Sequence, residues 1–119
     1  MATLVLLPVS TVHTVEKAQD KTVPGAGFIL FRQKDIVEIA LVKGKNKDGK
    51  WGFPKGCSEQ KDDGNLIFTA YRELFEEAGI KAELFDAFTG SPLIETKQKT
   101  CKQNGNIYDK INYYFTGIM

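Results

Sequence analysis

The stretch from Asn65 to Ala78 constrains the fold most, because it is the one segment with a clear helical period. Asp63 or Asn65 can cap its start, and Gly79 stands where a glycine commonly ends a helix. At about 100° per residue, five apolar side chains share one broad face: Ile67, Tyr71, Leu74, Phe75 and Ala78. The sequence therefore predicts one amphipathic helix over 65–78.

Short apolar runs on both sides of this helix predict the strands of a sheet. Two runs precede the helix and two follow it: 28–31, 36–42, 80–88 and 107–118. We expect Gly90-Ser91-Pro92 to end the third strand, and the polar, Lys-rich stretch 94–106 gives no prediction of a strand. Strands around one central helix predict an α/β domain with a mixed sheet.

The length of 119 residues suits a single domain over 1–119, in which residues 1–23 are an N-terminal extension of undefined pattern. Hydrophobic residues make up 42% and charged residues 26%, an ordinary globular composition. No apolar run approaches the roughly 18–20 residues of a membrane span, and no signal peptide is recognised. Two cysteines, Cys57 and Cys101, cannot build a disulfide framework. We therefore expect a cytoplasmic, intracellular protein with no membrane partner.

The formal net charge of +1 hides a segregation of charge along the chain. Segment 43–55 has five lysines and one acid, and segment 97–110 has four lysines and one acid. Between them, segment 57–86 has eight acids and three bases. Such runs are typical of solvated faces, but they also fit an acidic metal site flanked by basic loops that meet phosphates. Composition alone does not choose between the two.

Three glutamates, Glu73, Glu76 and Glu77, share one arc of the predicted helix, about 100° wide and opposite the apolar face. Like charges at these spacings destabilise a helix by about 0.2–0.5 kcal/mol per pair, and their place near its C-terminal end opposes the helix dipole. A divalent cation would remove the repulsion, and carboxylate oxygens suit Mg²⁺ or Mn²⁺. A lone acidic triplet is also typical of a solvated face, so the choice between a metal site and a solvated face depends on the neighbouring residues.

The residues around the triplet extend the pattern. Gly56 precedes the string R-E-L-F-E-E-A-G-I, residues 72–80. This string resembles the second half of the Nudix hydrolase box, G-x5-E-x7-R-E-U-x-E-E-x-G-U with U apolar, at all seven specified positions. The box would occupy 56–80, and the likeness extends over about residues 24–118. The resemblance implies a Nudix-type α/β/α sandwich with a mixed sheet.

The first half of the box departs from the family's pattern. Sixteen positions separate Gly56 from Arg72, where the family has fourteen, so the loop carries two extra residues. Asp62 stands where counting from Gly56 would place the family's first Glu, and Asp63 follows it. In the family that Glu supports the helix and its Arg. We expect Asp62 or Asp63 to replace it, unless the contact is lost.

The resemblance implies a role for each matching residue. Glu73 and Glu77 would bind a divalent metal, Mg or Mn, with Glu76 as a further ligand or outer-sphere partner and the Gly56 carbonyl facing a metal. Glu73 is alternatively the base that takes a proton from the attacking water. Arg72 would brace the carboxylates of the catalytic site through salt bridges.

Three residues are candidates for substrate binding. Lys55, beside the box glycine, and Lys43, at the start of the first basic segment, would contact phosphates. Phe53 would stack on a base. For Lys55 an ordinary surface lysine is an equal alternative, and for Phe53 a place in the core is the commoner outcome.

The resemblance implies an enzyme that hydrolyses a nucleoside diphosphate linked to another moiety. Trp51 to Gly56 resembles a segment of mRNA-decapping enzymes and of dinucleoside-polyphosphate hydrolases, and residues 71–77 are similar to RNA 5′-pyrophosphohydrolases. The expected substrate is therefore a nucleoside or dinucleoside polyphosphate, or a capped or triphosphorylated RNA 5′ end. Two alternatives stay open: an ADP-sugar or housecleaning pyrophosphatase, and a Nudix-like module that binds nucleotide or RNA without cleaving it.

Nudix domains usually continue past the strand that resembles 107–118, with a loop that often carries a further catalytic Glu. We therefore expect a domain truncated at its C-terminus, in which Glu95 is the best substitute for the late acid. A sheet face left open would expose an apolar patch. Self-association into a homo-oligomer, or residues 1–23, would cover it unless the chain is a fragment.

Overall fold

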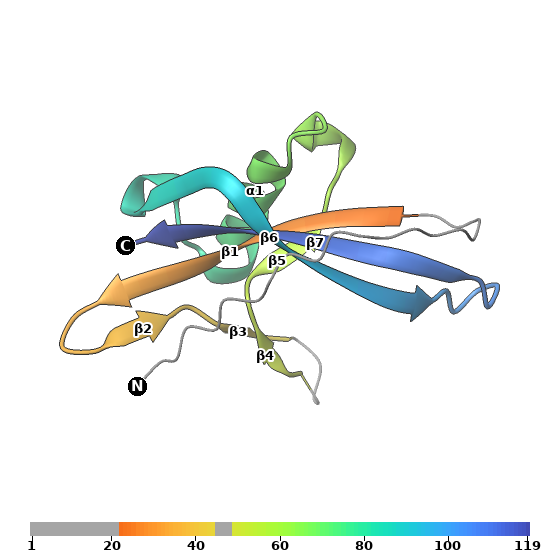
Figure 1. Cartoon of the computed structure of the whole chain (residues 1–119), viewed down its shortest axis with the longest axis horizontal. Helices are drawn as coiled ribbons and strands as arrows, with labels where there is room; N and C mark the ends of the chain where they lie inside the picture. The colour runs from red at the N-terminus through yellow and green to blue at the C-terminus, as the bar shows by residue number, and fades with distance from the viewer. Residues whose placement is uncertain (1–21, 45–48) are drawn as a thin grey trace.

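The structure is a computed structural model that describes residues 22–44 and 49–119 (Figure 1). The expectations for residues 1–21, and for Lys45 and Lys47 of the first basic segment, lie outside the described residues. Within the described ranges no helix is long and apolar enough to span a membrane.

A five-stranded mixed sheet organises the chain. Its central strands, β1 (Thr22–Gln33) and β7 (Ile107–Ile118), run parallel, with Phe28 opposite Phe115. Antiparallel neighbours flank them: β6 (Asp86–Thr100) beside β7, and β2 (Val37–Ile39) and β5 (Lys55–Cys57) beside β1. A separate two-stranded sheet pairs β3 (Val42–Lys43) with β4 (Trp51–Gly52). The predicted α/β fold with a mixed sheet is confirmed.

The predicted helix is α1 (Leu66–Ala78). The side chain of Asn65 caps its start by accepting a hydrogen bond from the Ile67 amide at 3.1 Å. Gly79 ends it at φ 69°, in the left-handed conformation that glycine adopts without strain. Between β5 and α1, a 3-10 turn, η1 (Gln60–Asp62), is closed by Asp63, so that Asp63 does not cap α1.

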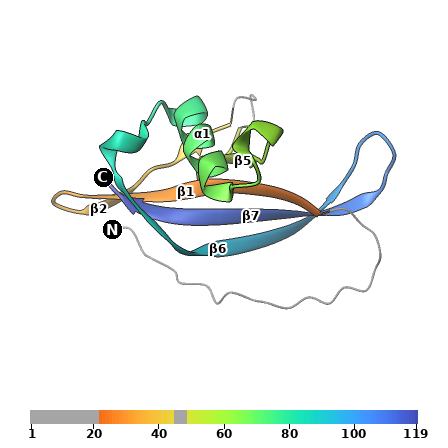
Figure 2. The same cartoon turned by 90° about the horizontal axis from the view of Figure 1, so that it is seen from above.

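The core lies between α1 and one face of the sheet, and Figure 2 shows the helix lying over that face. Ala70 and Leu74 of α1 meet strand residues that are also buried: Ala26, Phe28, Leu30 and Phe115. Tyr71 packs its ring 5.0 Å from that of Phe28. We call the sheet face under α1 the helix face and the other the open face, which no described helix covers (Figure 2).

The predicted apolar face of α1 is partly wrong. Phe75 is 51% exposed, and Ala78 is also exposed. The stripe that meets the sheet has the spacing i, i+3, i+4, i+7, from Ile67 through Ala70 and Tyr71 to Leu74. Phe75 lies on the flank of this narrower stripe, so it does not reach the sheet.

The predicted strand over 80–88 is also wrong in its bounds. Residues Ala82–Leu84 form a 3-10 turn, η2, and β6 starts only at Asp86. Gly90-Ser91-Pro92 does not end β6 but lies in a bulge, because Phe88 pairs with Thr116 and Leu93 with Tyr114. A bulge tolerates glycine and a proline that has no amide hydrogen.

The stretch 94–106, for which no strand was predicted, begins as the second half of β6. It pairs with β7 as far as Thr100 opposite Ile107. The apolar strand β7 supplies the backbone partners that hold this polar sequence in an extended conformation. The two strands continue as a ribbon that ends in a turn at 101–106 (Figure 1).

Candidate active site

The first feature of the site is the close approach of β5 to the C-terminal half of α1. Gly56 lies under Glu73, and a side-chain carbon at Gly56 would collide with the Glu73 carboxylate. One residue earlier, the Lys55 amide donates a hydrogen bond to Glu77 Oε1 at 3.0 Å. The structure therefore brings together three of the predicted metal-binding positions, Gly56, Glu73 and Glu77.

Arg72 ties the loop to the helix. Its guanidinium donates to both oxygens of Asp62 at 2.9 and 2.8 Å and to the Cys57 carbonyl at 2.9 Å. It also donates to Glu73 Oε2 at 2.9 Å and to Glu76 Oε1 at 3.2 Å. This planar fork suits arginine and not lysine. Its contacts are those expected of a residue that braces the carboxylates.

Asp62, and not Asp63, meets Arg72. Asp62 is 3% exposed, and its Oδ2 also accepts from the Thr69 hydroxyl at 2.8 Å and the Glu59 amide at 2.9 Å. The hydrogen bond from Arg72 holds the pKa of Asp62 well below its ordinary value, although burial opposes this shift. The turn η1 shapes the lengthened loop so that Asp62, whose side chain is shorter than that of the family's Glu, reaches Arg72.

Glu73 has the opposite electrostatic setting. Burial raises the pKa of this carboxyl above its ordinary value, and the negative charges of Glu76 and Glu77 add to the rise. The hydrogen bond and charge of Arg72 only partly offset it. A partly buried carboxylate among like charges is stabilised by a nearby cation.

The oxygen atoms that the site offers are of the kind that bind a divalent metal. Glu73 and Glu77 offer hard oxygen atoms, and Gly56 has no side chain to shield its carbonyl. In the part of the chain that the structure describes, no three acidic, histidine or cysteine side chains already converge as a metal centre. Glu76 is turned towards Arg72 and Glu77 towards the Lys55 amide. Exposed side chains such as these two would have to turn to share an ion.

Two of the predicted substrate-binding residues, Lys55 and Phe53, lie on the open face, and Lys43 lies in the separate two-stranded sheet. Lys55 is paired with Gly27, so its side chain projects to the open face. Phe53 packs against Tyr114 in an edge-to-face arrangement, with ring centroids 5.6 Å apart, and is half-buried. Lys43 lies opposite Trp51 in the separate two-stranded sheet, and no hydrogen bond or ion pair of the described residues joins it to the glutamates.

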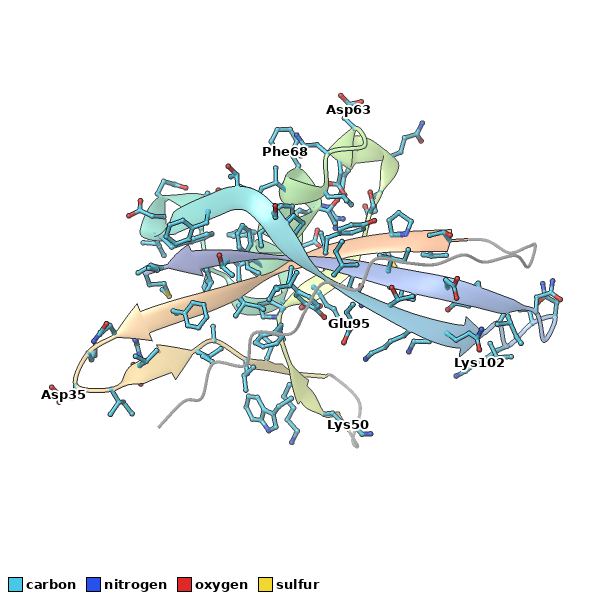
Figure 3. The ribbon with its side chains drawn as sticks, viewed as in Figure 1. Asp35, Lys50, Asp63, Phe68, Glu95 and Lys102 are labelled. Atoms are coloured by element: carbon cyan, nitrogen blue, oxygen red, sulfur yellow. The ribbon has the colours of Figure 1, made fainter. Side chains whose placement is uncertain are left out.

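Glu95 lies on the open face and does not contact the glutamates of α1. Its Oε1 accepts from Asn112 Nδ2 at 3.0 Å and from the Tyr114 hydroxyl at 3.2 Å, while Lys97 lies 3.7 Å from Oε2. Burial raises the pKa of Glu95, but Asn112, Lys97, Tyr114 and Lys55 together hold it below its ordinary value. Figure 3 labels Glu95 near the centre of the sheet. A role as late catalytic acid stays a prediction.

Sequence reasoning missed Thr69 and Asn112. Thr69 is fully buried in α1 and binds Asp62, but one threonine in a helix carries no signal of such a contact. Asn112 is 2% exposed within a strand. Its signal was available, because an amide in the middle of the apolar run I-N-Y-Y-F has to find a polar partner.

Comparison with solved structures identifies similar folds. An Ap4A hydrolase of C. elegans, solved as a binary complex, has a TM-score of 0.63 and 25% identity over 81% of this chain. The MutT protein of Methanosarcina mazei Go1 has a TM-score of 0.54 and 17% identity over 87% of this chain and 68% of its own. The NUDIX domain of Shewanella oneidensis NrtR, complexed with ADP ribose, has a TM-score of 0.52 and 20% identity. This match covers 85% of the present chain and 62% of the NrtR chain.

The present chain spans 65% of the length of the C. elegans Ap4A hydrolase. Comparison of this sequence with curated proteins finds no match. The family model described as the NUDIX domain matches residues 21–115, which is most of the chain and includes the whole box. The chain therefore belongs to the NUDIX domain family.

Proposed function

We propose that this chain hydrolyses a nucleoside diphosphate linked to another moiety, with Mg or Mn as the metal. The observation that carries the proposal is the Arg72 fork, which joins the Asp62 loop to the helix that bears Glu73 and Glu76. The fork holds Glu73, which lies beside Gly56, although the loop has two extra residues. The presence of all three glutamates, Glu73, Glu76 and Glu77, supports catalysis over a module that only binds nucleotide.

The chemistry of the proposal divides between metal and protein. A bound divalent ion would neutralise charge on the phosphoryl oxygens and make a water nucleophilic. Glu73, Glu77 and the Gly56 carbonyl would hold it, with Glu76 as a further or outer-sphere partner. In the alternative role, Glu73 would accept the proton of the attacking water. Arg72 orients Glu73 without touching the substrate.

We further propose a nucleoside or dinucleoside polyphosphate, or a capped or triphosphorylated RNA 5′ end, as the substrate. The likeness to the C. elegans Ap4A hydrolase supports the first class, and the basic segment 97–110 supports a substrate with several phosphates. An ADP-sugar substrate is the second candidate, supported by the NrtR domain that was crystallised with ADP ribose. The free thiols of Cys57 and Cys101 are compatible with a reducing cytoplasm.

A substrate panel tests the proposal. The chain is incubated with Mg²⁺ or Mn²⁺ and Ap4A, ADP-ribose or a 5′-triphosphorylated RNA, and new phosphate-bearing products are separated by ion-exchange chromatography. We expect products from at least one substrate, abolished by EDTA and strongly reduced in Glu77→Gln. Tight nucleotide binding with no product from any substrate would instead identify a non-catalytic binding module.

A further inference from the structure

The β6–β7 ribbon separates its charges between its two faces. On the open face, Lys97 pairs directly with Lys110, and Lys99 pairs with Tyr108. On the helix face of the same segment, Gln98 pairs with Asp109 and Thr100 with Ile107. We call Lys97, Lys99, Tyr108 and Lys110 the lysine face. It contains no acid, although Asp109 lies on the same ribbon.

Two lysines placed directly opposite each other repel, so this pairing does not serve the stability of the sheet. Their existing contacts are weak or unusual. Lys97 lies 3.7 Å from Glu95, at the inner end of the lysine face, and Lys110 donates to the Cys57 thiol at 2.7 Å. A polyanion would relieve the repulsion between the two ammonium groups.

The lysine face lies on the open face of the sheet, whereas the Gly56–Glu73 contact lies on the helix face, and the edge strand β5 joins the two surfaces. Lys110 contacts Cys57, which directly follows Gly56, the residue under the Glu73 carboxylate. Both ribbon strands and Cys57 line one surface hollow. In Figure 3, Lys102 marks the far part of the ribbon and Glu95 the part nearer the centre of the sheet. Positive charge therefore extends along the open face as far as β5, whose other side carries the Gly56–Glu73 contact.

The spacing along this surface suits a chain of phosphates. Two residues along a strand advance by about 7 Å, so Lys99 extends the surface beyond the Lys97–Lys110 pair by that length. Tyr108 adds a half-buried ring beside Lys99, and an aromatic ring among lysines offers a base a stacking surface. A free nucleotide would end at the metal site, whereas a nucleic acid strand would continue over these residues.

We propose that the lysine face binds the first nucleotides of a single-stranded nucleic acid whose 5′ phosphates reach the glutamates. This inference rests on the proposed function for the position of the 5′ phosphates. The lysines hold the phosphodiester backbone, and Tyr108 stacks on a base. Of the substrate classes proposed above, the lysine face then favours a 5′-phosphorylated strand.

Fluorescence anisotropy in EDTA, where no hydrolysis takes place, tests the binding. The probes are a labelled ten-nucleotide RNA with a 5′ triphosphate and the DNA strand of the same sequence. We expect Lys97→Gln and Lys110→Gln each to weaken binding and to reduce the slope of log K against log salt by about 0.7. Tyr108→Ala should weaken binding roughly tenfold, and Tyr108→Phe should restore it.

Lys34→Gln is the matched control, because Lys34 lies in the β1–β2 turn beside Asp35, at the other end of the sheet from Lys102 (Figure 3). Thermal unfolding of each variant checks that the ribbon still folds. Equal affinity and salt slope for Lys34→Gln and the ribbon variants would overturn the proposal. Tighter binding of the RNA than of the DNA would identify RNA as the ligand, and equal binding would identify any single strand.

Hydrolysis of Ap4A and ADP-ribose with Mg²⁺ separates this inference from the proposed function. We expect the ribbon variants to raise the Kd for RNA by a larger factor than the KM for whichever of these small substrates is hydrolysed. If the ribbon variants raise the KM for Ap4A as much as the Kd for RNA, the proposal of a bound nucleic acid strand is overturned. The lysine face would then bind small polyphosphates. If no substrate is hydrolysed while RNA binding still depends on the ribbon, the proposed function fails and the binding surface stands.

Discussion

Two carboxylates with several hydrogen bonds lie on opposite sides of the sheet, Asp62 beside α1 and Glu95 on the open face, and they are used differently. Asp62 is 3% exposed, and Arg72, Thr69 and the Glu59 amide occupy both of its oxygens. The Glu95 side chain is 38% exposed, and both of its donors share Oε1, which leaves Oε2 loosely paired with Lys97. A fully used, buried carboxylate holds the fold together, whereas a half-used one is available to a ligand.

The largest effect is expected at Glu73 of α1, where a substitution should change activity more than one at Asp62 or Glu95. Glu73→Gln should lower kcat/KM by about 10²–10⁴-fold, because it removes the charged group that we propose as metal ligand or base. Steady-state kinetics on the best substrate of the panel measures it. The urea unfolding midpoint should stay close to that of the unchanged chain; a variant that unfolds would make Glu73 a structural residue.

Asp62→Asn tests the structural half of the comparison. It should lower the free energy of unfolding by about 2–3 kcal/mol, because it leaves the Arg72 guanidinium, 13% exposed, without its charged partner. Urea denaturation measures the change. The isosteric control is Asp63→Asn, at an exposed position, which should stay within about 0.5 kcal/mol. Equal losses in the two variants would contradict the assignment of Asp62 as the partner of Arg72.

The pH dependence of the unfolding free energy is a second test of the contact between Asp62 and Arg72. The pKa of Asp62 is lower in the folded chain than in the unfolded one, where it is near 3.9. Its contribution is therefore fully present above about pH 5 and is lost as the pH falls through the unfolded value towards the folded one. Unfolding free energies measured from pH 6 to pH 2 should fall less steeply in Asp62→Asn. Parallel curves for the two proteins would show that another group controls the acid limb.

The smallest expected effect is that of Glu95→Gln. Glutamine keeps an acceptor for Asn112 and Tyr114, so only the charge is lost, and stability should change by about 1 kcal/mol or less. Activity should fall by less than about tenfold, mainly through KM, because Glu95 does not touch the glutamates of α1. A fall in kcat as large as that of Glu73→Gln would establish Glu95 as the late catalytic acid and break the comparison.

Local signals in the sequence were sufficient for α1 and for the identity of the box. A helix with Asn65 and Gly79 at its ends depends on contacts within one turn, which a sequence displays directly. The parallel pair β1–β7 at the centre of the sheet depends on residues more than eighty positions apart. The sequence predicted the whole of β7 but only residues 28–31 of β1, and the pairing of the two strands belongs to the tertiary structure.

The sequence by itself determined the helix, its glutamates, the arginine and the glycine beside which they lie, because the spacing of these residues is local. Only the tertiary structure decided that Asp62 meets Arg72, that Phe75 misses the core and that β6 continues to Thr100. It also placed Lys97 and Lys110 on one face. The physical reason is that strand register and loop shape are set by partners distant in sequence, and a shift of one residue would turn each strand side chain to the other face.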